Sequence, residues 1–337
     1  MKEKYRLSKA VLLMGLMLGI ASFILPSSAA AGTVWKMQQI YGPTNYQSIE
    51  LKRFAKDVTV RTKGDLTIEV FDGGGLGVPW NNALTSLQSG AISIIEIPVA
   101  YMGGQDRFFG LEYLPLLITS VGEHCLAMDS IYGLRVQEFA KFNVIPVAHW
   151  PYQNQTFVSK KPLRTLADFK GKRLRSTSPE DALLIKALGG IPVTMPMTDV
   201  YLTAQRGGLD GYTTAPSGMV GMSAWEVFGY FNEISWGMAG SVILVNKDAY
   251  HKLSGETRSI FLEEVYKLQE QMHALVKENY KADSKKLIDK GMKRVVPSPD
   301  LIAHMKKIAP AIWEEWAKKA GPVSQSGLNK IRTVLDK

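Results

Sequence analysis

The segment from residue 166 to residue 216 restricts the fold of this chain more than any other part of the sequence. It reads as a short strand, a helix, a turn into a second strand, and a closing Asp210-Gly211 pair, and it places Arg175 at the end of the first strand. A guanidinium is a planar, permanently charged group that holds a carboxylate through two parallel hydrogen bonds. The segment therefore predicts an α/β unit that presents a fixed anchor for an anionic ligand.

The first 31 residues have the pattern of an export signal. Residues 1–9 carry four basic side chains and one acidic one, residues 10–25 are uncharged and largely apolar, and small residues follow. The apolar run is shorter than the roughly 20 residues that a membrane-spanning helix needs. We predict cleavage after Ala30 or Ala31 and a periplasmic mature protein. An uncleaved membrane anchor is the alternative.

About 306 residues remain after the signal, which is more than one hydrophobic core usually supports, so we expect two domains. Strand-like and helix-like segments alternate throughout, as is typical of the α/β class. We expect strands at 34–41, 66–71, 91–99 and 144–150, and helices at 46–62, 81–87, 121–142, 253–289 and 299–336. The strand at 91–99 is largely apolar, which indicates that both of its faces are covered.

Charge and cysteine content exclude several classes of protein. The formal net charge of +9 falls to +6 without the signal, and the basic residues show no cluster with interleaved aromatics, so we expect no nucleic-acid partner. The one cysteine, Cys125, cannot form an intramolecular disulfide and is expected to be a buried small hydrophobe. Its distance from the signal excludes a lipid anchor at the amino terminus.

The sequence carries no catalytic motif. The five histidines are scattered without an H-E-x-x-H pattern, and no G-x-S-x-G sequence occurs. The glycines at 73–77 lack the Lys-Ser/Thr ending of a phosphate loop and are interpreted as a turn. His149 is interpreted as a structural imidazole. We therefore expect a protein that is not an enzyme and that has no cofactor and no metal.

Five motifs in order along the chain resemble the solute-binding proteins of tripartite ATP-independent periplasmic (TRAP) transporters, the DctP-like family. They lie at 58–70, 75–77, 114–118, 168–176 and 188–211. Each one alone is weak, but their order over nearly the whole mature chain is specific. The resemblance is reduced at 210–214, where Asp-Gly-Tyr-Thr-Thr replaces a family motif that ends in asparagine. It is also reduced at Gln155, where some members have a second basic residue.

The resemblance implies a two-lobed clamshell with discontinuous lobes, mixed sheets and a long connecting helix. We expect residues 32–157 with about 242–265 in one lobe, 158–241 with about 290–337 in the other, and 253–289 as the helix. The family's substrate-binding arginine corresponds to Arg175. The implied partners are a small organic acid and the small and large integral membrane subunits of a TRAP transporter, and we expect the receptor to be a monomer.

The candidate ligand-binding residues are polar or aromatic side chains at strand-to-helix turns, where small-molecule sites commonly lie. They are Arg175, Gln155, Met197, Tyr212, Thr213, Thr214, Trp80, Tyr101, Tyr152, Trp236 and Asn45. One arginine among aromatic walls predicts a monocarboxylate with an apolar or aromatic body.

Several alternatives remain open at this point. The ligand can instead be a dicarboxylate or a 2-oxo acid, and the receptor can serve another importer or a sensor. Arg175 can form a structural salt bridge with Asp210 or Asp199, and each aromatic can be ordinary core.

Overall fold

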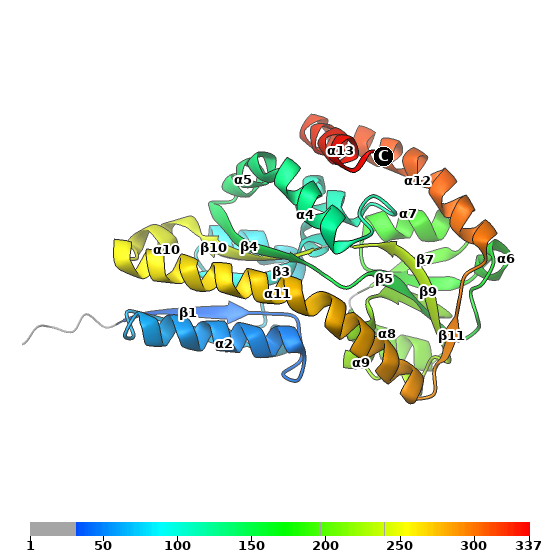
Figure 1. Cartoon of the computed structure of the whole chain (residues 1–337), viewed down its shortest axis with the longest axis horizontal. Coiled ribbons are helices and arrows are strands. Elements are labelled where there is room, and N and C mark those ends of the chain that lie inside the picture. The colour runs from blue at the N-terminus through cyan, green and yellow to red at the C-terminus, as the bar shows by residue number, and fades with distance from the viewer. Residues whose placement is uncertain (1–31, 196, 239) are drawn as a thin grey trace, which may run out of the picture. The chain divides into compact units, whose positions relative to one another are not determined.

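The computed structural model describes residues 32–195, 197–238 and 240–337. The predicted export signal, residues 1–31, lies outside the described residues. From Thr33 onward the chain forms one compact unit, shown in Figure 1. Within the described ranges, no helix combines the length and the apolar character needed to cross a lipid bilayer.

Two mixed sheets form the centre of this unit. The first has the strand order β2-β1-β3-β10-β4, and the second has the order β11-β9-β5-β8-β6-β7. The strands of the first sheet are β1 (Thr33–Gln38), β2 (Leu66–Phe71), β3 (Ile94–Pro98), β4 (Val144–Pro151) and β10 (Gly240–Asn246). Those of the second are β5 (Gln155–Ser159), β6 (Arg173–Ser176), β7 (Ile191–Thr194), β8 (Gly211–Thr214), β9 (Tyr230–Gly237) and β11 (Lys293–Val295). Both sheets contain parallel and antiparallel pairs, as predicted.

Helices connect the strands and cover the sheets. The α-helices are α2 (Tyr46–Arg61), α3 (Ala83–Gln88), α4 (Val121–Ser130), α5 (Tyr132–Ala140), α6 (Leu166–Phe169), α7 (Pro179–Ala187), α8 (Met197–Gln205), α9 (Pro216–Gly221), α10 (Lys247–Lys252), α11 (Gly255–Asp289), α12 (Pro299–Ala320) and α13 (Pro322–Leu335). Short 3-10 helices are η1 (Asp72–Gly74), η2 (Trp80–Asn82), η3 (Val99–Met102), η4 (Arg107–Tyr113) and η5 (Ala224–Glu226). The helix expected at 121–142 is divided at Ile131, whose φ of −110° and ψ of 8° are not helical.

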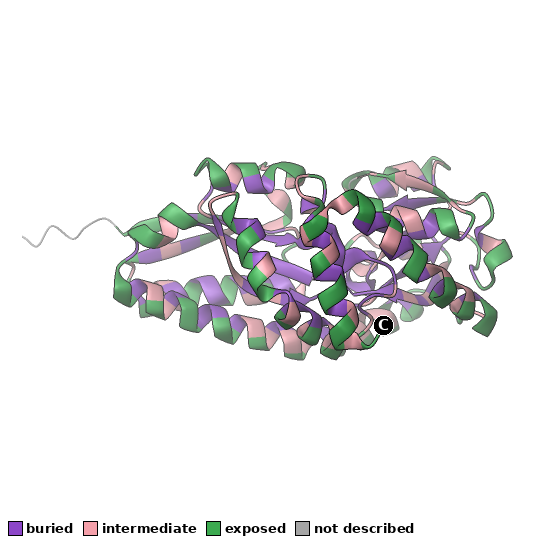
Figure 2. Cartoon of the chain, turned by 90° about the horizontal axis from the view of Figure 1, so that it is seen from above, coloured by how far each residue is buried: buried purple, intermediate pink, exposed green. Residues whose placement is uncertain are grey.

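Both faces of the first sheet are buried, which explains the apolar sequence of its central strands. In β3, Ile95 and Ile97 face one hydrophobic cluster, whereas Ile94 faces another on the opposite side. All five residues of β3 are buried, as expected for a strand covered on both faces. Figure 2 shows the same pattern, with burial concentrated in the strands and exposure on the outer sides of the helices.

The long helix predicted at 253–289 forms α11. Its 35 residues span about 50 Å, and it packs against α2, β4 and α9, so that it contacts elements that flank both sheets. Two of its side chains also bind the outer edge of β4, where Gln269 Oε1 accepts the amide hydrogen of His149 at 2.9 Å and His273 Nε2 lies 3.3 Å from the His149 carbonyl oxygen. These contacts bind the backbone groups of His149 at this sheet edge, where unpaired groups could otherwise pair with another chain.

The chain crosses between the sheets more than once. It leaves the first sheet after β4 and enters the second at β5, and it returns between β9 and β10. The first sheet is therefore built from strands in 33–151 and 240–246, and the second from strands in 155–237 and 293–295.

Two further features of the structure differ from the sequence-based expectation. Residues 290–337 were assigned to the second lobe, but α13 packs on α4 and η4, and its Leu328 and Ile331 belong to a core cluster of the first sheet. Local periodicity identifies the helix but not the distant surface that it covers. Cys125 on α4 is half-buried rather than fully buried.

Candidate functional site

Arg175 is a buried cation that has no anionic partner among the residues that the structure describes. Its side chain is 1% exposed and lies at the carboxyl end of β6. The Nε group donates to the Met195 carbonyl oxygen at 2.9 Å, and Nη1 donates to Thr177 Oγ1 at 2.8 Å and to the Thr213 carbonyl oxygen at 3.3 Å. Among the described residues, Nη2 has no hydrogen-bond partner, and no carboxylate lies within ion-pair distance of the guanidinium.

Neither of the acids proposed as structural partners of Arg175 binds it. Asp210 Oδ2 accepts the amide hydrogen of Arg173 at 2.8 Å and lies 3.9 Å from the Arg173 Nε atom. Asp199 lies in the first turn of α8, where it accepts a hydrogen bond from Thr198. A buried charge is costly unless an opposite charge or hydrogen bonds compensate it. Nη2 is therefore the position at which a bound anion would compensate the charge.

The backbone around Arg175 is held by the start of α7. Ser178 and Asp181 form a capping box at this helix, and Asp181 also accepts a hydrogen bond from the Thr213 hydroxyl. Burial raises the pKa of Asp181, which opposes its ionisation. We call Arg175, Thr177 and Thr213 the arginine half. These residues lie at the carboxyl ends of the parallel strands β6 and β8 or directly after them. Open α/β sheets hold their ligands at this edge.

Tyr212, Thr214 and Met197 lie close to the arginine half. Tyr212 is the register partner of Arg175, is fully buried, and packs on Phe228 with ring centroids 5.1 Å apart. Burial raises its pKa, and its hydroxyl has no partner within the described part of the chain. A Cβ atom placed on Gly218 would lie 2.4 Å from Thr214 Oγ1 and 3.4 Å from Met197 Cε, so these two side chains meet at α9.

Trp236 and Gln155 are joined by Tyr113, a residue that the sequence analysis missed. The Tyr113 ring packs edge-on against Trp236 at 5.5 Å, and its hydroxyl donates to Gln155 Oε1 at 3.4 Å. Burial raises the pKa of Tyr113, and the nearby Arg175 charge acts in the opposite direction. The Trp236 Nε1 atom is buried and has no partner among the described residues.

A second polar group lies at the carboxyl ends of β1, β3 and β4. Glu96 of β3 is fully buried, and its Oε1 atom accepts hydrogen bonds from the hydroxyls of Tyr41 and Ser241. The Tyr41 hydroxyl in turn donates to that of the predicted site residue Tyr152. We call this group the glutamate half; it consists of Glu96, Tyr41, Tyr152 and Ser241. The Glu96 Oε2 atom is buried and has no hydrogen-bond partner in the described ranges.

Burial is the main reason why the pKa of Glu96 rises to about 7, while its hydrogen bonds act in the opposite direction. The sequence carried a signal for this residue, since a single charge interrupts the apolar run 91–99. Carboxylates are almost never fully buried in a strand without a specific reason.

The remaining predicted residues differ in their surroundings. Burial has the larger effect in raising the pKa of Tyr113 and of Tyr152, and Tyr101 raises both further, so Tyr101 lies near Tyr113 and near the glutamate half. Trp80 is half-buried and its ring lies 6.3 Å from that of Tyr101. The Asn45 side chain instead caps α2, where it accepts the amide hydrogen of Gln47 at 2.9 Å. No contact described joins Asn45 to either half.

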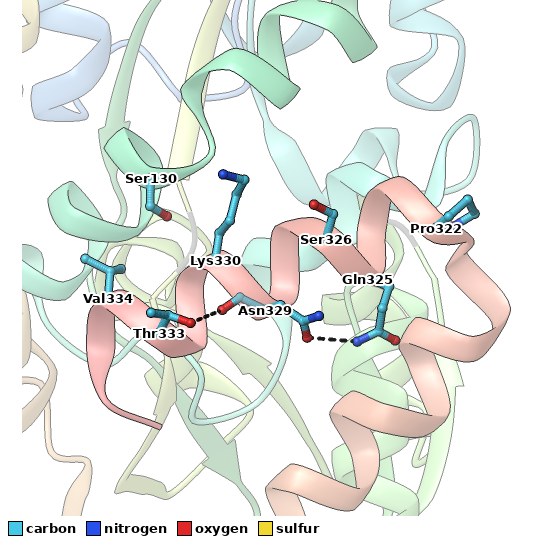
Figure 3. Close-up of a pocket in the computed structure, with 8 residues that line it drawn as sticks. All are labelled: Ser130, Pro322, Gln325, Ser326, Asn329, Lys330, Thr333 and Val334. Atoms are coloured by element: carbon cyan, nitrogen blue, oxygen red, sulfur yellow. Dashed lines mark hydrogen bonds between the residues drawn. The ribbon is translucent and has the colours of Figure 1, made fainter.

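One open surface pocket lies away from these residues. It has a volume of about 550 Å³. Figure 3 shows that it is formed by α13 and Ser130. Its lining mixes polar and apolar surface and includes a hydrogen bond of 3.0 Å between Gln325 and Asn329. It contains none of the predicted site residues and no buried charge, so the unpartnered polar atoms of the two halves are the stronger indication of a ligand.

Known proteins resemble this chain over most of its length. The profile of the family described as bacterial extracellular solute-binding protein, family 7 (DctP), matches residues 37–319. A crystal structure of DctP7, an extracytoplasmic solute receptor of Bordetella pertussis binding pyroglutamic acid, is 26% identical with a TM-score of 0.84, covering 89% of this chain and 100% of that one.

Two further relatives show how broad the resemblance is. The 2,3-diketo-L-gulonate-binding periplasmic protein of Escherichia coli (strain K12) is 25% identical over 285 residues, which cover 82% of each chain. A TRAP periplasmic solute-binding protein of Chromohalobacter salexigens with bound D-glucuronate is 21% identical with a TM-score of 0.83, covering 89% of this chain and 99% of that one. The latter shows the shared fold alone and confirms the predicted fold class.

Proposed function

Because this chain belongs to family 7 of the bacterial extracellular solute-binding proteins, the DctP-like receptors of TRAP transporters, we propose that its ligand is a monocarboxylate with an apolar or aromatic body. The chain is a receptor for small organic acids rather than an enzyme. In this proposal it is exported, its signal is cleaved, and it delivers the acid to the small and large membrane subunits of a TRAP symporter.

The buried Nη2 atom of Arg175 is the observation that carries this proposal. Its charge is removed from water and lacks an anionic partner among the described residues. A ligand carboxylate would supply that partner. A charge-assisted hydrogen bond contributes about 1.5–3 kcal/mol, and any second bond to the same carboxylate would add geometric selectivity.

The body of the ligand is proposed from the groups around the arginine. Tyr113 and Trp236 supply aromatic surface, and Tyr212 and the Trp236 indole supply buried donors. Glu96 of the glutamate half would accept a hydrogen bond from an N–H or O–H group of the ligand, and it would repel a second carboxylate. The pyroglutamic acid bound by the Bordetella pertussis receptor, a compact ring with one carboxylate and one N–H group, fits this description.

A dicarboxylate or 2-oxo acid is the second candidate, in which Gln155 and Thr214 would bind the distal group. The observed bonds of Gln155 to Tyr113 and to the Gln153 carbonyl oxygen already occupy both ends of its amide. This arrangement favours the monocarboxylate.

The test is calorimetry on the mature protein with pyroglutamate, aromatic monocarboxylates, sugar acids and C4-dicarboxylates. We expect Arg175→Met to weaken binding of the preferred acid at least about tenfold, in line with the loss of a charged hydrogen bond. Arg173→Met is the matched control, since Arg173 lies two residues away on the same strand and is exposed. Equal affinity of Arg175→Met and the unaltered protein would refute the carboxylate anchor, and selective binding of dicarboxylates would refute the proposed ligand class.

A further inference from the structure

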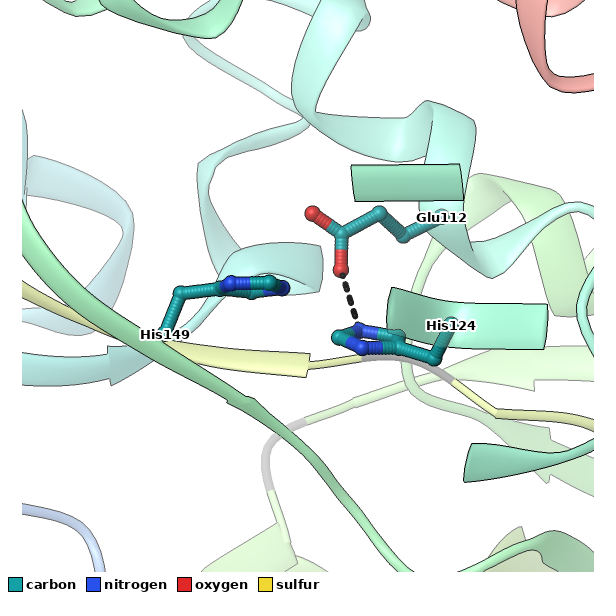
Figure 4. A group of neighbouring side chains, drawn as sticks. All are labelled: Glu112, His124 and His149. Carbon is teal, nitrogen blue, oxygen red and sulfur yellow. Dashed lines mark hydrogen bonds and ion pairs between the residues drawn. The ribbon is translucent and has the colours of Figure 1, made fainter. Parts of the chain in front are cut away.

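Three metal-ligating side chains that are distant in sequence meet beside the first sheet. Figure 4 shows Glu112 of η4, His124 of α4 and His149 of β4 side by side. Each offers one ligand atom, and these atoms lie within 4.8 Å of one another. His124 Nε2 is 3.3 Å from Glu112 Oε2, and the two imidazole rings are stacked with centroids 4.7 Å apart. The scattered spacing of the histidines in the sequence gave no indication of this cluster, and it shares no residue with either half of the ligand site.

The cluster has more buried polar atoms than the described residues satisfy. His124 is fully buried, and its Nδ1 atom has no partner in the described part of the chain. The same holds for the His149 Nε2 atom, although His149 as a whole is half-buried. An unsatisfied buried polar group costs about 1–3 kcal/mol, and two neighbouring imidazoles with free nitrogens beside a carboxylate indicate that another species completes the arrangement.

We propose that Glu112, His124 and His149 form a binding site for one divalent transition-metal ion of the zinc class. Imidazole nitrogens with one carboxylate suit Zn²⁺, Co²⁺ or Ni²⁺, whereas Mg²⁺ and Ca²⁺ require mostly oxygen ligands. Three protein ligands leave a fourth position for water.

Metal binding requires a small contraction of the cluster. Two ligand atoms that each lie about 2.1 Å from one ion cannot be more than about 4.2 Å apart, so any pair near the upper bound of 4.8 Å must approach by up to roughly half an ångström. The two rings are inclined by only 25°, and a ligating nitrogen points along its ring plane. The His124 ring therefore has to turn out of the stack and release its contact with Glu112 Oε2.

Two neighbours limit the affinity and fix the position of this site. Arg135 Nη2 lies 3.8 Å from Glu112 Oε1, so a positive charge opposes the ion, and Oε2 is the carboxylate oxygen that lies beside His124. The Gly240 amide donates to Glu112 Oε2 at 3.1 Å, and a Cβ atom there would lie 2.7 Å from His124 Nε2. The crossover between the sheets thus closes one side of the cluster. We expect a weaker site than the closed sites of structural zinc proteins.

The test is titration of metal-free, tag-free mature protein with ZnCl₂ by calorimetry and with CoCl₂ by visible absorption. We expect one ion per chain and, at a hundredfold excess over the dissociation constant, a melting temperature raised by about 5 °C. MgCl₂ should have no effect. His149→Gln should remove the zinc-induced shift and the cobalt spectrum, whereas His251→Gln, at an exposed histidine of α10, should retain both.

Two controls keep the test decisive. His149→Gln is preferred over changes at the fully buried His124 because its side chain is partly exposed, and circular dichroism without metal must show an unaltered fold. The absence of saturable zinc binding, or equal binding by His149→Gln, would overturn the proposal and leave water as the species that completes the cluster. These outcomes do not depend on the organic acid, since no such ligand is added.

Discussion

Replacement of Glu96 by glutamine should change the pH dependence of stability by an amount that the structure fixes. Glu96 is fully buried, and burial raises its pKa from 4.5 to about 7 in the folded protein. The folded state therefore binds a proton more tightly than the unfolded state, and the free energy of unfolding decreases as the pH rises from 4.5 to about 7. Above that range the ionised, buried carboxylate costs the protein about 3 kcal/mol relative to the unfolded chain.

Glu96→Gln removes this ionisation and retains an oxygen that can accept from Tyr41 and Ser241. From pH 5 to pH 8, the free energy of unfolding of Glu96→Gln should therefore rise by about 2.5 kcal/mol relative to that of the unaltered protein. Burial lowers the pKa of His149 and His273, which makes stability increase with pH over part of this range. Both histidines are present in both proteins, so their contribution cancels in the difference.

The measurement is urea denaturation of both proteins at pH 5, 6, 7 and 8, followed by tryptophan fluorescence. Glu69→Gln, at an exposed position of β2, is the matched control for loss of a carboxylate. If the difference between Glu96→Gln and the unaltered protein stays constant over this range, the reasoning about the buried carboxylate is wrong. A change in the denaturant slope would instead indicate an altered folded or unfolded state.

Three other changes should have defined effects. Gly211→Ala should lower the free energy of unfolding, measured by denaturation, by about 1–3 kcal/mol. The reason is that the added Cβ would lie 2.4 Å from the Val158 carbonyl oxygen on the neighbouring strand. Unchanged stability would contradict this packing. Ser178→Ala removes the cap of α7 and should lower the free energy of unfolding by about 1 kcal/mol, and a Thr at this position should restore most of it. Mass spectrometry of the secreted protein should find a chain that begins after Ala30 or Ala31, and retention of the first 31 residues would favour the uncleaved anchor.

Regular elements could be predicted well because their signals are local. The strand at 66–71 has the predicted bounds, and the long helix at 253–289 begins two residues late, where Ser254 accepts the amide hydrogen of Thr257 as the N-cap. The break at Ile131 escaped prediction because no proline or N-cap residue marks it. The docking of α13 on α4 also escaped, since an amphipathic pattern does not identify the surface that a helix will cover.

The candidate site could be predicted only where one residue has a distinctive chemistry. Arg175 was predicted from its position at a strand end together with the resemblance to the DctP-like family, and the structure adds its burial and an Nη2 atom without a partner among the described residues. Tyr113 was missed because its contacts with Trp236 and Gln155 join three segments that are distant in sequence. The proximity of Glu112 to His149 could not be predicted from the sequence for the same reason. Whether the predicted residues bind a ligand together stays a prediction that the variants above will test.

The position of β10 between β3 and β4 has a consequence for biosynthesis. A nascent chain that ends before residue 240 lacks the strand that separates these two, so both retain open edges and the first sheet cannot be completed. Stable structure in the amino-terminal half must therefore wait until about seven-tenths of the polypeptide has left the ribosome. Such a delay keeps the chain unfolded for longer, as the export proposed above would require of a precursor that crosses a membrane before it folds.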